Sequence, residues 1–387
     1  MIRNILFVSH SAELNGSERM LLQTLNRIDR SKFYLCLLLP QPGPLGEEVK
    51  KLGIQEEIIH YKWWLTEKSK IWKQPFSWMW NIKSVFQICK IIHKRRISLV
   101  FSNSSVAFSG ALAAKARRIP HVWSIHEILC GKNPLIYFFF GNRALVNLIS
   151  CLSTRIIVNS SASQKAFKQR KKVRLIYNAL EIGNKNIVPK NALREEFGIG
   201  KKDFILGVVG KIYREKGQRE VILAVDSIRR TYPHVKLLVV GGVKDQDYYL
   251  ELKKLVKERN LEKHVCFVGY RKDIFNLLRS IDLLVVSSSV DSFGLAALEA
   301  MAVKTPVLAV RAGGLPEIIS HGKNGFLIES RKPEIIQKEV ESILKNPLKV
   351  AEVTEEGFRT ARERFSLKEQ VKEIEKVMDE CFEYNRR

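Results

Sequence analysis

The chain alternates short apolar runs with longer segments of helical periodicity, and the whole alternation occurs twice. Short apolar runs of this kind are typical of parallel strands that are covered on both faces. In the first half they fall at Ile5–Val8, Tyr34–Leu39, Leu99–Phe101, Val122–Ile125 and Arg155–Val158. In the second half they fall at Ile205–Val209, Lys236–Val240, Val265–Val268, Leu283–Val286 and Pro306–Ala309. Strands that alternate with helices predict a doubly wound α/β domain, so we expect two such domains.

Helix candidates lie between these runs, at Ser17–Arg27, Val106–Arg117, Gly217–Arg230, Asp247–Arg259 and Ile274–Ser280. A length of 387 residues exceeds what one ordinary core supports, which agrees with two domains. We therefore predict a first domain over residues 1–180, a polar linker over 181–202 and a second domain over 203–365. Residues 366–387 include a last stretch with helical spacing, Leu367–Tyr384.

The cysteines and the lengths of the apolar runs indicate in which cellular compartment the protein works. The six cysteines are scattered without a CxxC pair, which favours a reducing environment over a zinc site or a disulfide framework. Ile5–Val8 is too short for a secretory signal and is typical of a first strand. No run of about 18 apolar residues occurs, and the nearest candidate, 134–150, is interrupted by Asn142 and Arg143. We expect a cytoplasmic protein.

The net charge of +25 is concentrated in the first half of the chain. Residues 1–180 hold 28 basic and 9 acidic side chains, a net of +19, and five of the six tryptophans lie between Trp63 and Trp80. Basic residues interleaved with large aromatic ones are typical of a surface that docks on anionic lipid. A solvated basic face with a few core aromatics is a close alternative, and nucleic acid is a distant one. We predict peripheral binding to an anionic membrane through residues 61–96, and no nucleic-acid partner.

The segment from Val290 to Ala302 carries the clearest chemistry. It places two carboxylates, Asp291 and Glu299, on either side of a Phe293-Gly294 turn that opens a helix at Leu295. A helix start offers free N–H groups and a positive dipole end, which suit a phosphate. A carboxylate on each side could accept hydrogen bonds from the hydroxyls of a sugar and of a ribose.

This segment resembles the signature of the retaining glycosyltransferases of family four, which have the GT-B fold. That signature is an acidic residue, seven residues and then Glu, and Asp291 here departs from the usual first Glu. The resemblance implies two facing Rossmann-like domains with a cleft between them, and a C-terminal helix that packs back toward the first domain. It also implies that Glu299 binds the ribose and Asp291 the sugar of a nucleotide diphosphate sugar.

Further segments of the second half are similar to the same family. Gly210 to Gly217 follows a strand and carries Lys211, where the family usually has Arg, and Lys216. Two cations on a strand-to-helix turn can neutralise a leaving diphosphate. Gly269 and Tyr270 end a strand where the family holds the nucleotide base. The Gly-Gly-Leu-Pro-Glu loop at 313–317 is similar to the family's glycine loop, and 324–327 to its Asn-Gly-Phe-Leu turn, which we interpret as structural.

The first half matches the family less closely. Glu13 to Glu18 stands where the family has Gly-Gly-Ala-Glu, and Gly16 keeps the second glycine, which lets backbone approach a phosphate or sugar. His126 ends a predicted strand and resembles the family's catalytic histidine, which implies a place beside the reacting sugar. A lone His after a strand is usually structural, but open α/β sheets place ligands at this strand end.

Taken together, the resemblance predicts a metal-independent retaining hexosyltransferase without a cofactor. Asp245-Gln246-Asp247 has the spacing of a metal motif but stands in a variable loop, so we expect a surface turn. The expected acceptor is a glycan or a lipid-linked molecule in surface polysaccharide, lipopolysaccharide or glycolipid synthesis, at the inner face of the cytoplasmic membrane. Two alternatives stay open: a sugar-nucleotide epimerase of the same fold, and a non-catalytic partner subunit of a glycosyltransferase.

Overall fold

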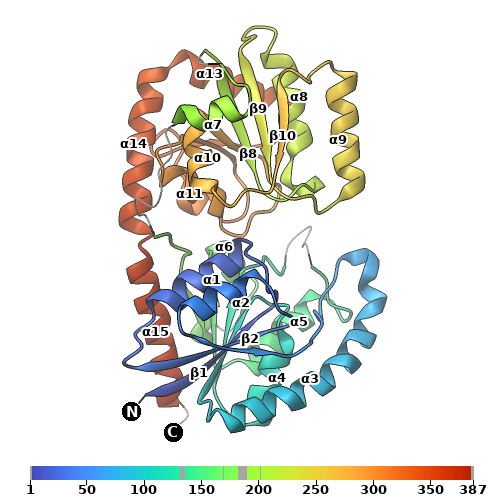
Figure 1. Ribbon diagram of the computed structural model, residues 1–387, viewed down its shortest axis with the longest axis vertical. Coiled ribbons are helices and arrows are strands. Elements are labelled where there is room, and N and C mark those ends of the chain that lie inside the picture. The colour runs from blue at the N-terminus through green and yellow to red at the C-terminus, as the bar shows by residue number, and fades with distance from the viewer. Residues whose placement is uncertain (1, 131–135, 169, 182–189, 201, 385–387) are drawn as a thin grey trace. The chain divides into compact units, whose positions relative to one another are not determined.

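The structure is a computed structural model that describes residues 2–130, 136–168, 170–181, 190–200 and 202–384. The chain divides into two compact units. Unit 1 comprises Met1–Glu181 and Ser366–Arg387, and unit 2 comprises Ile182–Phe365. Each unit is a parallel sheet covered by helices, as the alternation of strands and helices predicts (Figure 1).

Unit 1 has a seven-stranded parallel sheet in the order β3-β2-β1-β4-β5-β6-β7. Its strands are β1 (Arg3–Ser9), β2 (Phe33–Leu39), β3 (Gln55–Ile58), β4 (Leu99–Asn103), β5 (His121–Ile125), β6 (Arg155–Val158) and β7 (Val173–Leu175). The chain moves outward from β1 to β3 and then returns to place β4 on the other side of β1. The strand order therefore reverses between β1 and β4, which is where open α/β sheets bind ligands.

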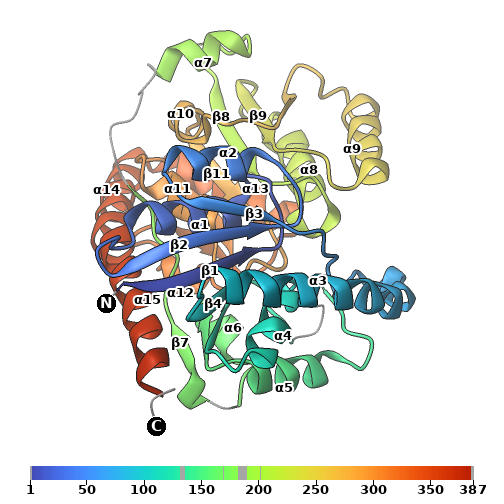
Figure 2. The ribbon, with the colours of Figure 1, turned by 60° about the horizontal axis from the view of Figure 1, so that its bottom comes forward.

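The helices of unit 1 cover both faces of this sheet (Figures 1 and 2). They are α1 (Gly16–Arg27), α2 (Pro44–Lys51), η1 (Lys68–Lys73), α3 (Gln74–Lys94), α4 (Phe108–Ala116), α5 (Asn142–Leu152), α6 (Ser161–Gln164), η2 (Arg170–Lys172) and α15 (Leu367–Tyr384). The last helix, α15, lies beside α1 and is tied to the sheet by ion pairs. Arg3 contacts Asp379 at 2.7 Å, and Arg155 contacts Glu380 at 2.9 Å.

Unit 2 has a six-stranded parallel sheet in the order β10-β9-β8-β11-β12-β13. Its strands are β8 (Phe204–Val209), β9 (Val235–Val240), β10 (Val265–Gly269), β11 (Leu283–Val286), β12 (Val307–Val310) and β13 (Phe326–Ile328). The strand order reverses between β8 and β11, because the chain runs outward from β8 to β10 and returns to pair β11 with β8. The loops that follow β8 and β11 therefore flank a second switch point.

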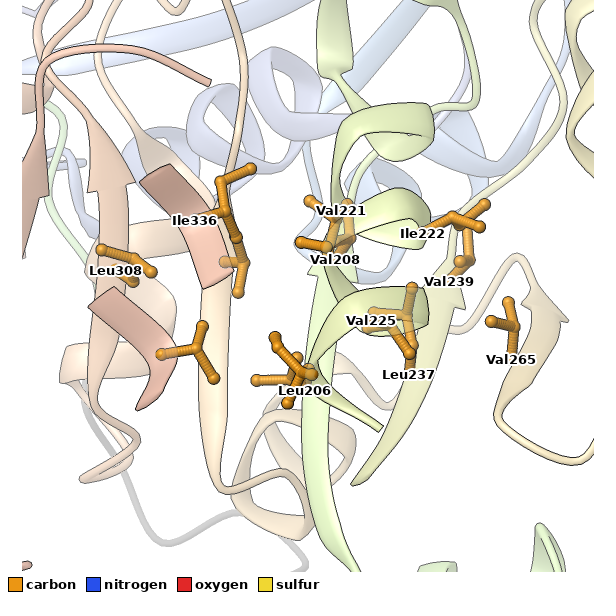
Figure 3. Packing of buried hydrophobic residues seen from close by; sticks show 14 of the residues in the cluster. Leu206, Val208, Val221, Ile222, Val225, Leu237, Val239, Val265, Leu308 and Ile336 are labelled. Carbon is orange, nitrogen blue, oxygen red and sulfur yellow. The ribbon is translucent and has the colours of Figure 1, made fainter. Parts of the chain in front are cut away.

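The helices of unit 2 lie around this sheet (Figure 1). They are α7 (Lys190–Glu196), η3 (Arg214–Lys216), α8 (Gln218–Ile228), α9 (Gln246–Glu258), α10 (Ile274–Ser280), α11 (Leu295–Met301), α12 (Leu315–Ile318), α13 (Pro333–Lys345) and α14 (Pro347–Arg364). Figure 3 shows Val221 and Val225 of α8 over Leu206 and Val208 of β8, in a core where these side chains are almost fully buried. Each such burial contributes roughly 1.5–3 kcal/mol relative to exposure.

Sequence and structure differ where an element is short or polar. The edge strand β3 has the sequence Gln-Glu-Glu-Ile and carries no apolar run, and β7 and β13 are three residues each. The predicted linker at 181–202 contains a helix, α7, whose Arg194 is buried and donates to the Asp282 carboxylate at 2.6 Å. None of the helices in the described ranges combines the length and the apolar run that crossing a bilayer takes.

Candidate active site

Three loops meet at the carboxyl edge of the sheet in unit 2. They follow β8, β11 and β12, and they carry most of the residues that the sequence singles out. The glycines in these loops set how closely the loops approach. A Cβ on Gly217 would lie 2.5 Å from the carbonyl oxygen of Ser287, so only glycine lets the first loop reach the second. At the switch point, the loop after β8 and the loop after β11 are therefore in direct backbone contact.

The loops after β11 and β12 lock together in the same way. Gly313 has φ +55°, and a Cβ there would lie 1.8 Å from the carbonyl oxygen of Asp291. The next N–H, that of Gly314, donates to this same oxygen at 2.9 Å. The Gly-Gly pair therefore holds the backbone of Asp291 in one position and directs its side chain toward the loop after β8.

Lys216 and Asp291 form an ion pair across two of these loops. The Lys216 Nζ lies 3.0 Å from Asp291 Oδ2, and the two side chains are 22% and 16% exposed. Burial alone lowers the pKa of Lys216, but the charge of Asp291, the Tyr213 hydroxyl and the hydrogen bond to Asp291 together raise it above its usual value. The ammonium group is therefore charged at neutral pH and fixed in direction. Such a fixed, partly buried cation suits the stabilisation of a phosphate.

Lys211, the other predicted cation, is an exposed residue at the start of this loop, and its backbone carbonyl accepts a hydrogen bond from the Gln218 amide at 3.0 Å. Gly210, with φ +142°, precedes it and donates its N–H to Val240 at 2.9 Å. Gly241, the residue after Val240, donates to the carbonyl of Gly269 at 2.8 Å. Gly210 and Gly269 are thus linked through one intervening strand end.

The predicted base-binding residue Tyr270 lies just beyond Gly269 and is exposed.

The short helix α11 follows Gly294, which has φ +100°. A Cβ on Gly294 would lie 2.6 Å from the Leu315 side chain. Phe293 is buried against Phe365, with ring centroids 5.8 Å apart, so its side chain belongs to the core. Its N–H lies 3.4 Å from Asp291 Oδ1. Residues 293–295 are predicted to contact the donor. Because the Phe293 side chain is in the core, such a contact can be made by the backbone of this segment.

Glu299 lies one helical turn beyond Leu295 and is 2% exposed. A carboxylate is rarely buried to this degree without polar partners. The structure thus gathers Gly210, Lys216, Asp291 and Gly294 around one switch point, with Glu299 buried in the helix that follows.

In unit 1, His126 is held by polar groups at the carboxyl edge of the sheet. Its Nε2 lies 2.7 Å from Asn103 Oδ1 and 3.3 Å from Ser124 Oγ. The amide of Asn103 donates in turn to the carbonyl of Ser17 at 3.4 Å, in the first turn of the helix that begins at Gly16. Ser17, the residue after Gly16, and His126 are therefore linked through Asn103 across the switch point between β1 and β4.

Burial lowers the pKa of His126 most; Glu127 and Glu18 oppose this shift, and the neighbouring His10 adds to it. The ring is therefore neutral at pH 7. A neutral imidazole can accept or donate a hydrogen bond without carrying a charge into the site.

Beside this site lies a buried pair of side chains, of which the family-like motifs include Glu18 but not His10. Glu18, 0% exposed, contacts His10 Nε2 at 3.1 Å. His10 directly follows β1, and its carbonyl accepts a hydrogen bond from the Trp63 indole at 2.7 Å. The position of His10 at a strand end next to the switch point is the sequence signal that could have found it. The Glu127 carboxylate is also held in place, because it accepts hydrogen bonds from Ser104 Oγ and from the N–H of Ser105 at 3.2 Å.

Asp245, part of the Asp-Gln-Asp sequence, has a structural role. Its side chain accepts a hydrogen bond from the N–H of Tyr248 at 3.0 Å and caps α9. A capping carboxylate of this kind satisfies one of the free N–H groups of the first turn.

Comparison with known families agrees with this fold. A model of the glycosyl transferases group 1 family matches residues 189–360, and a model of glycosyltransferase family 4 matches residues 14–183. The two matched ranges follow one another and divide the chain as the two sheets do. The chain belongs to the family-four glycosyltransferases with the GT-B fold.

Individual relatives are similar over different lengths. The chain is 31% identical to N-acetyl-alpha-D-glucosaminyl L-malate synthase of Bacillus anthracis over 197 residues, which span 51% of this chain and 49% of that protein. It is 27% identical to the uncharacterized glycosyltransferase MJ1178 of Methanocaldococcus jannaschii over 297 residues, which span 75% of this chain and 77% of that protein. The chain thus spans about half the length of the first of these relatives.

A solved structure is similar over nearly the whole chain. It is Alr3699/HepE of Anabaena in complex with UDP and glucose, with 27% identity, a TM-score of 0.83 and coverage of 97% of this chain and 99% of that one. The same Anabaena protein has also been solved in complex with UDP-glucose.

Proposed function

We propose that this glycosyltransferase moves a sugar from a nucleotide diphosphate sugar to a hydroxyl of a glycan or lipid-linked acceptor, and that it retains the anomeric configuration. The observation that carries the proposal is the Lys216–Asp291 pair, fixed at the switch point of unit 2 by glycine-tight loops. The binding of UDP-glucose by the similar Anabaena protein supports a uridine donor.

In this proposal the diphosphate lies against Lys216, with Lys211 as a second, exposed cation. Negative charge grows on the diphosphate when the sugar leaves, so a fixed ammonium stabilises the transition state more than the ground state. The backbone N–H groups near Gly294 and Leu295 add partial positive charge from the same side. Lysine and backbone donors would together supply the charge that a divalent cation supplies elsewhere, which is why we propose a metal-independent reaction.

The two carboxylates take different parts of the donor. Glu299 would accept hydrogen bonds from the ribose hydroxyls and Asp291 from the sugar, while Gly269 and Tyr270 border the base. Asp291 has two oxygens: Oδ2 contacts Lys216, and Oδ1 has the Phe293 N–H as a long contact at 3.4 Å. An oxygen with so weak an intramolecular donor can accept from a sugar hydroxyl.

The proposed chemistry is a front-side displacement. The bond between the anomeric carbon and the phosphate oxygen breaks, and the acceptor oxygen bonds to that carbon from the same side. The acceptor's proton passes to the leaving diphosphate, so the step needs no carboxylate nucleophile. His126, neutral and hydrogen-bonded to Asn103, would orient the reacting sugar or the acceptor through its ring.

For the acceptor, we propose a molecule held at the inner face of the cytoplasmic membrane, with residues 61–96 as the membrane contact. The excess of basic residues in this segment supports an anionic surface. Flotation with anionic vesicles at low and high salt tests the contact, and a protein that stays unbound at low salt contradicts it.

The experiment that tests sugar transfer is donor turnover in the presence of a chelator. We expect release of nucleotide from one nucleotide sugar, and a product whose anomeric proton has the donor's configuration by NMR. An epimerase would convert the donor's sugar without an acceptor. A non-catalytic partner subunit would bind donor without releasing nucleotide.

A further inference from the structure

Helix α3 has an inverted polarity in its first half. The side chains that it buries include Gln74, Asn81 and Ser84, which are polar. The side chains that it exposes include Phe76 and Trp80, which are large and apolar. An amphipathic helix on a water-facing surface normally does the reverse. The exposed face of this helix therefore suits a surface that is less polar than water.

The buried polar side chains fasten α3 to the body of unit 1. The Gln74 amide nitrogen donates to the carbonyl of Tyr137 at 2.7 Å, and its oxygen accepts from the N–H of Phe139 at 2.9 Å. The Asn81 amide makes two hydrogen bonds of 2.8 Å with the backbone of Lys62. Ser84 donates to the carbonyl of His60 at 2.6 Å. The helix is thus held in place by hydrogen bonds and keeps its apolar side chains free for another surface.

The exposed apolar side chains form one surface, which we call the α3 patch. Five of its members come from η1 and α3 and are each 60 to 70% exposed: Trp72, Phe76, Met79, Trp80 and Phe86. Two further exposed rings, Phe139 and Phe140, lie beside Trp78 of the same helix, whose ring stacks on Phe140 at 5.9 Å. Figure 2 shows α3 as a long helix on the outside of unit 1. A patch of this kind on a soluble protein marks an interaction site.

Positive charge surrounds the patch. Lys62 lies over the ring of Trp80 at 4.5 Å, and Lys73 lies over the ring of Trp72 at 5.1 Å. Lys83 and Lys90 lie on the exposed side of the helix, at helical spacing from Phe76 and Trp80. Between residues 61 and 96 the sequence has nine basic residues and one acid, Glu67. Large apolar rings beside lysines match the boundary between lipid headgroups and acyl chains.

We infer that the α3 patch enters the headgroup–acyl boundary of an anionic membrane as a preformed, rigid helix. The inference deepens the membrane contact proposed above, and its tests measure vesicle binding without any donor, so it can fail while sugar transfer holds. The alternative is that the patch binds a folded protein. In that case its side chains would not contact acyl chains, and the experiments below distinguish the two cases.

The first test is quenching of tryptophan fluorescence by vesicles whose acyl chains carry bromine. Trp72 and Trp80 should be quenched, and replacing both by Tyr should remove most of the quenching. Trp64 and Trp123 are buried in unit 1 and provide an internal reference that stays unquenched. Binding without quenching would overturn the proposal, because it would place the rings outside the acyl region.

The second test compares apolar side chains inside and outside the patch. The variant Phe76→Ser/Met79→Ser/Phe86→Ser should bind vesicles with 30% phosphatidylglycerol at least tenfold more weakly than the unchanged protein. The matched control is Leu250→Ser/Leu348→Ser in unit 2, which also removes exposed apolar groups and should bind normally. Equal binding by both variants, or a stable dimer that only the patch variant dissolves, would overturn the proposal. Circular dichroism and nucleotide affinity check that each variant folds.

The third test isolates charge. Changing Lys83 and Lys90 to Gln should weaken binding to anionic vesicles by about fivefold per lysine, on the basis of about 1 kcal/mol per charge near such a surface. Changing Lys254 and Lys257 of α9 to Gln serves as the control with the same loss of charge. An equal effect of the two pairs would mean that net charge alone, without the patch, binds the membrane.

Discussion

Lys216 and Asp291 are 75 positions apart in the sequence, yet their side chains form a 3.0 Å ion pair at the carboxyl edge of one sheet. Each residue comes from a loop that flanks the switch point between β8 and β11. In the proposed function, the pair fixes a cation beside the diphosphate and leaves one carboxylate oxygen for a sugar hydroxyl. Donor binding and leaving-group stabilisation would then depend on the same contact.

Replacing Lys216 with Gln should lower kcat roughly 100- to 1,000-fold, as the loss of one fixed donor to a developing charge does in other enzymes. The donor KM should change less, because the charge matters most when the diphosphate leaves. Steady-state kinetics checks both values. Arg214→Gln is the control on the same loop, since Arg214 is an exposed residue paired with Glu251. A Lys216→Gln variant with unchanged kcat would refute the proposed role.

Replacing Gly313 with Ala should displace the loop that carries Asp291, because the new Cβ would lie 1.8 Å from a backbone oxygen. We expect donor affinity and melting temperature both to fall. Gly322→Ala is the matched control: Gly322 also has a positive φ, but a Cβ there meets nothing within 4 Å. The control should lose only about 1–2 kcal/mol from backbone strain. Equal losses in the two variants would show that the contact with Asp291 does not matter.

Replacing Glu299 with Gln should weaken the binding of the nucleotide diphosphate by about 10- to 100-fold, the range of a hydrogen bond to a charged group. Titration calorimetry with UDP measures the affinity directly. Glu329→Gln, which changes an exposed carboxylate paired with Arg311, should leave the affinity unchanged. If Glu299→Gln binds UDP as the unchanged protein does, the ribose lies elsewhere.

The buried strands and the donor loops could be predicted because their signals are local. β8 and β11 are nearly continuous apolar runs, and Asp291 and Lys216 stand in segments that resemble a known signature. β3 could not be predicted from an apolar run, because an edge strand can be polar and still pair with its neighbour, here β2. The pairing of His10 with Glu18 depends on how a strand end and the first turn of α1 pack, which no local pattern encodes.

The tryptophans of the first half show the same limit. Trp64 and Trp80 stand in the same basic, aromatic segment, but Trp64 is buried and stacks on Phe108 at 4.0 Å, whereas Trp80 is exposed. Composition predicted a surface of this chemistry and did not say which rings would form it. Polar residues such as Asn81 determine that outcome, because their hydrogen bonds to the backbone turn the apolar side of α3 outward.

Acid should destabilise unit 1 through His121. Burial lowers the pKa of this residue from 6.5 to about 3. Below pH 6.5 the unfolded chain binds a proton on this ring that the folded chain does not bind until about pH 3. The free energy of unfolding should therefore fall with decreasing pH across this window, by up to about 1.4 kcal/mol per pH unit from this residue.

The variant His121→Gln should have a shallower pH dependence of unfolding than the unchanged protein between pH 6.5 and 4.5, by close to one proton. Urea denaturation at a series of pH values measures the two slopes. Identical slopes would mean that His121 is protonated in the folded state.

The most direct test of sugar transfer is nucleotide release from a panel of nucleotide sugars, with a chelator present and with or without membrane lipid. We predict release from one donor, increased by lipid and strongly reduced by Lys216→Gln. No release from any donor, with or without lipid and with intact folding, would contradict the proposal that this protein is a metal-independent transferase.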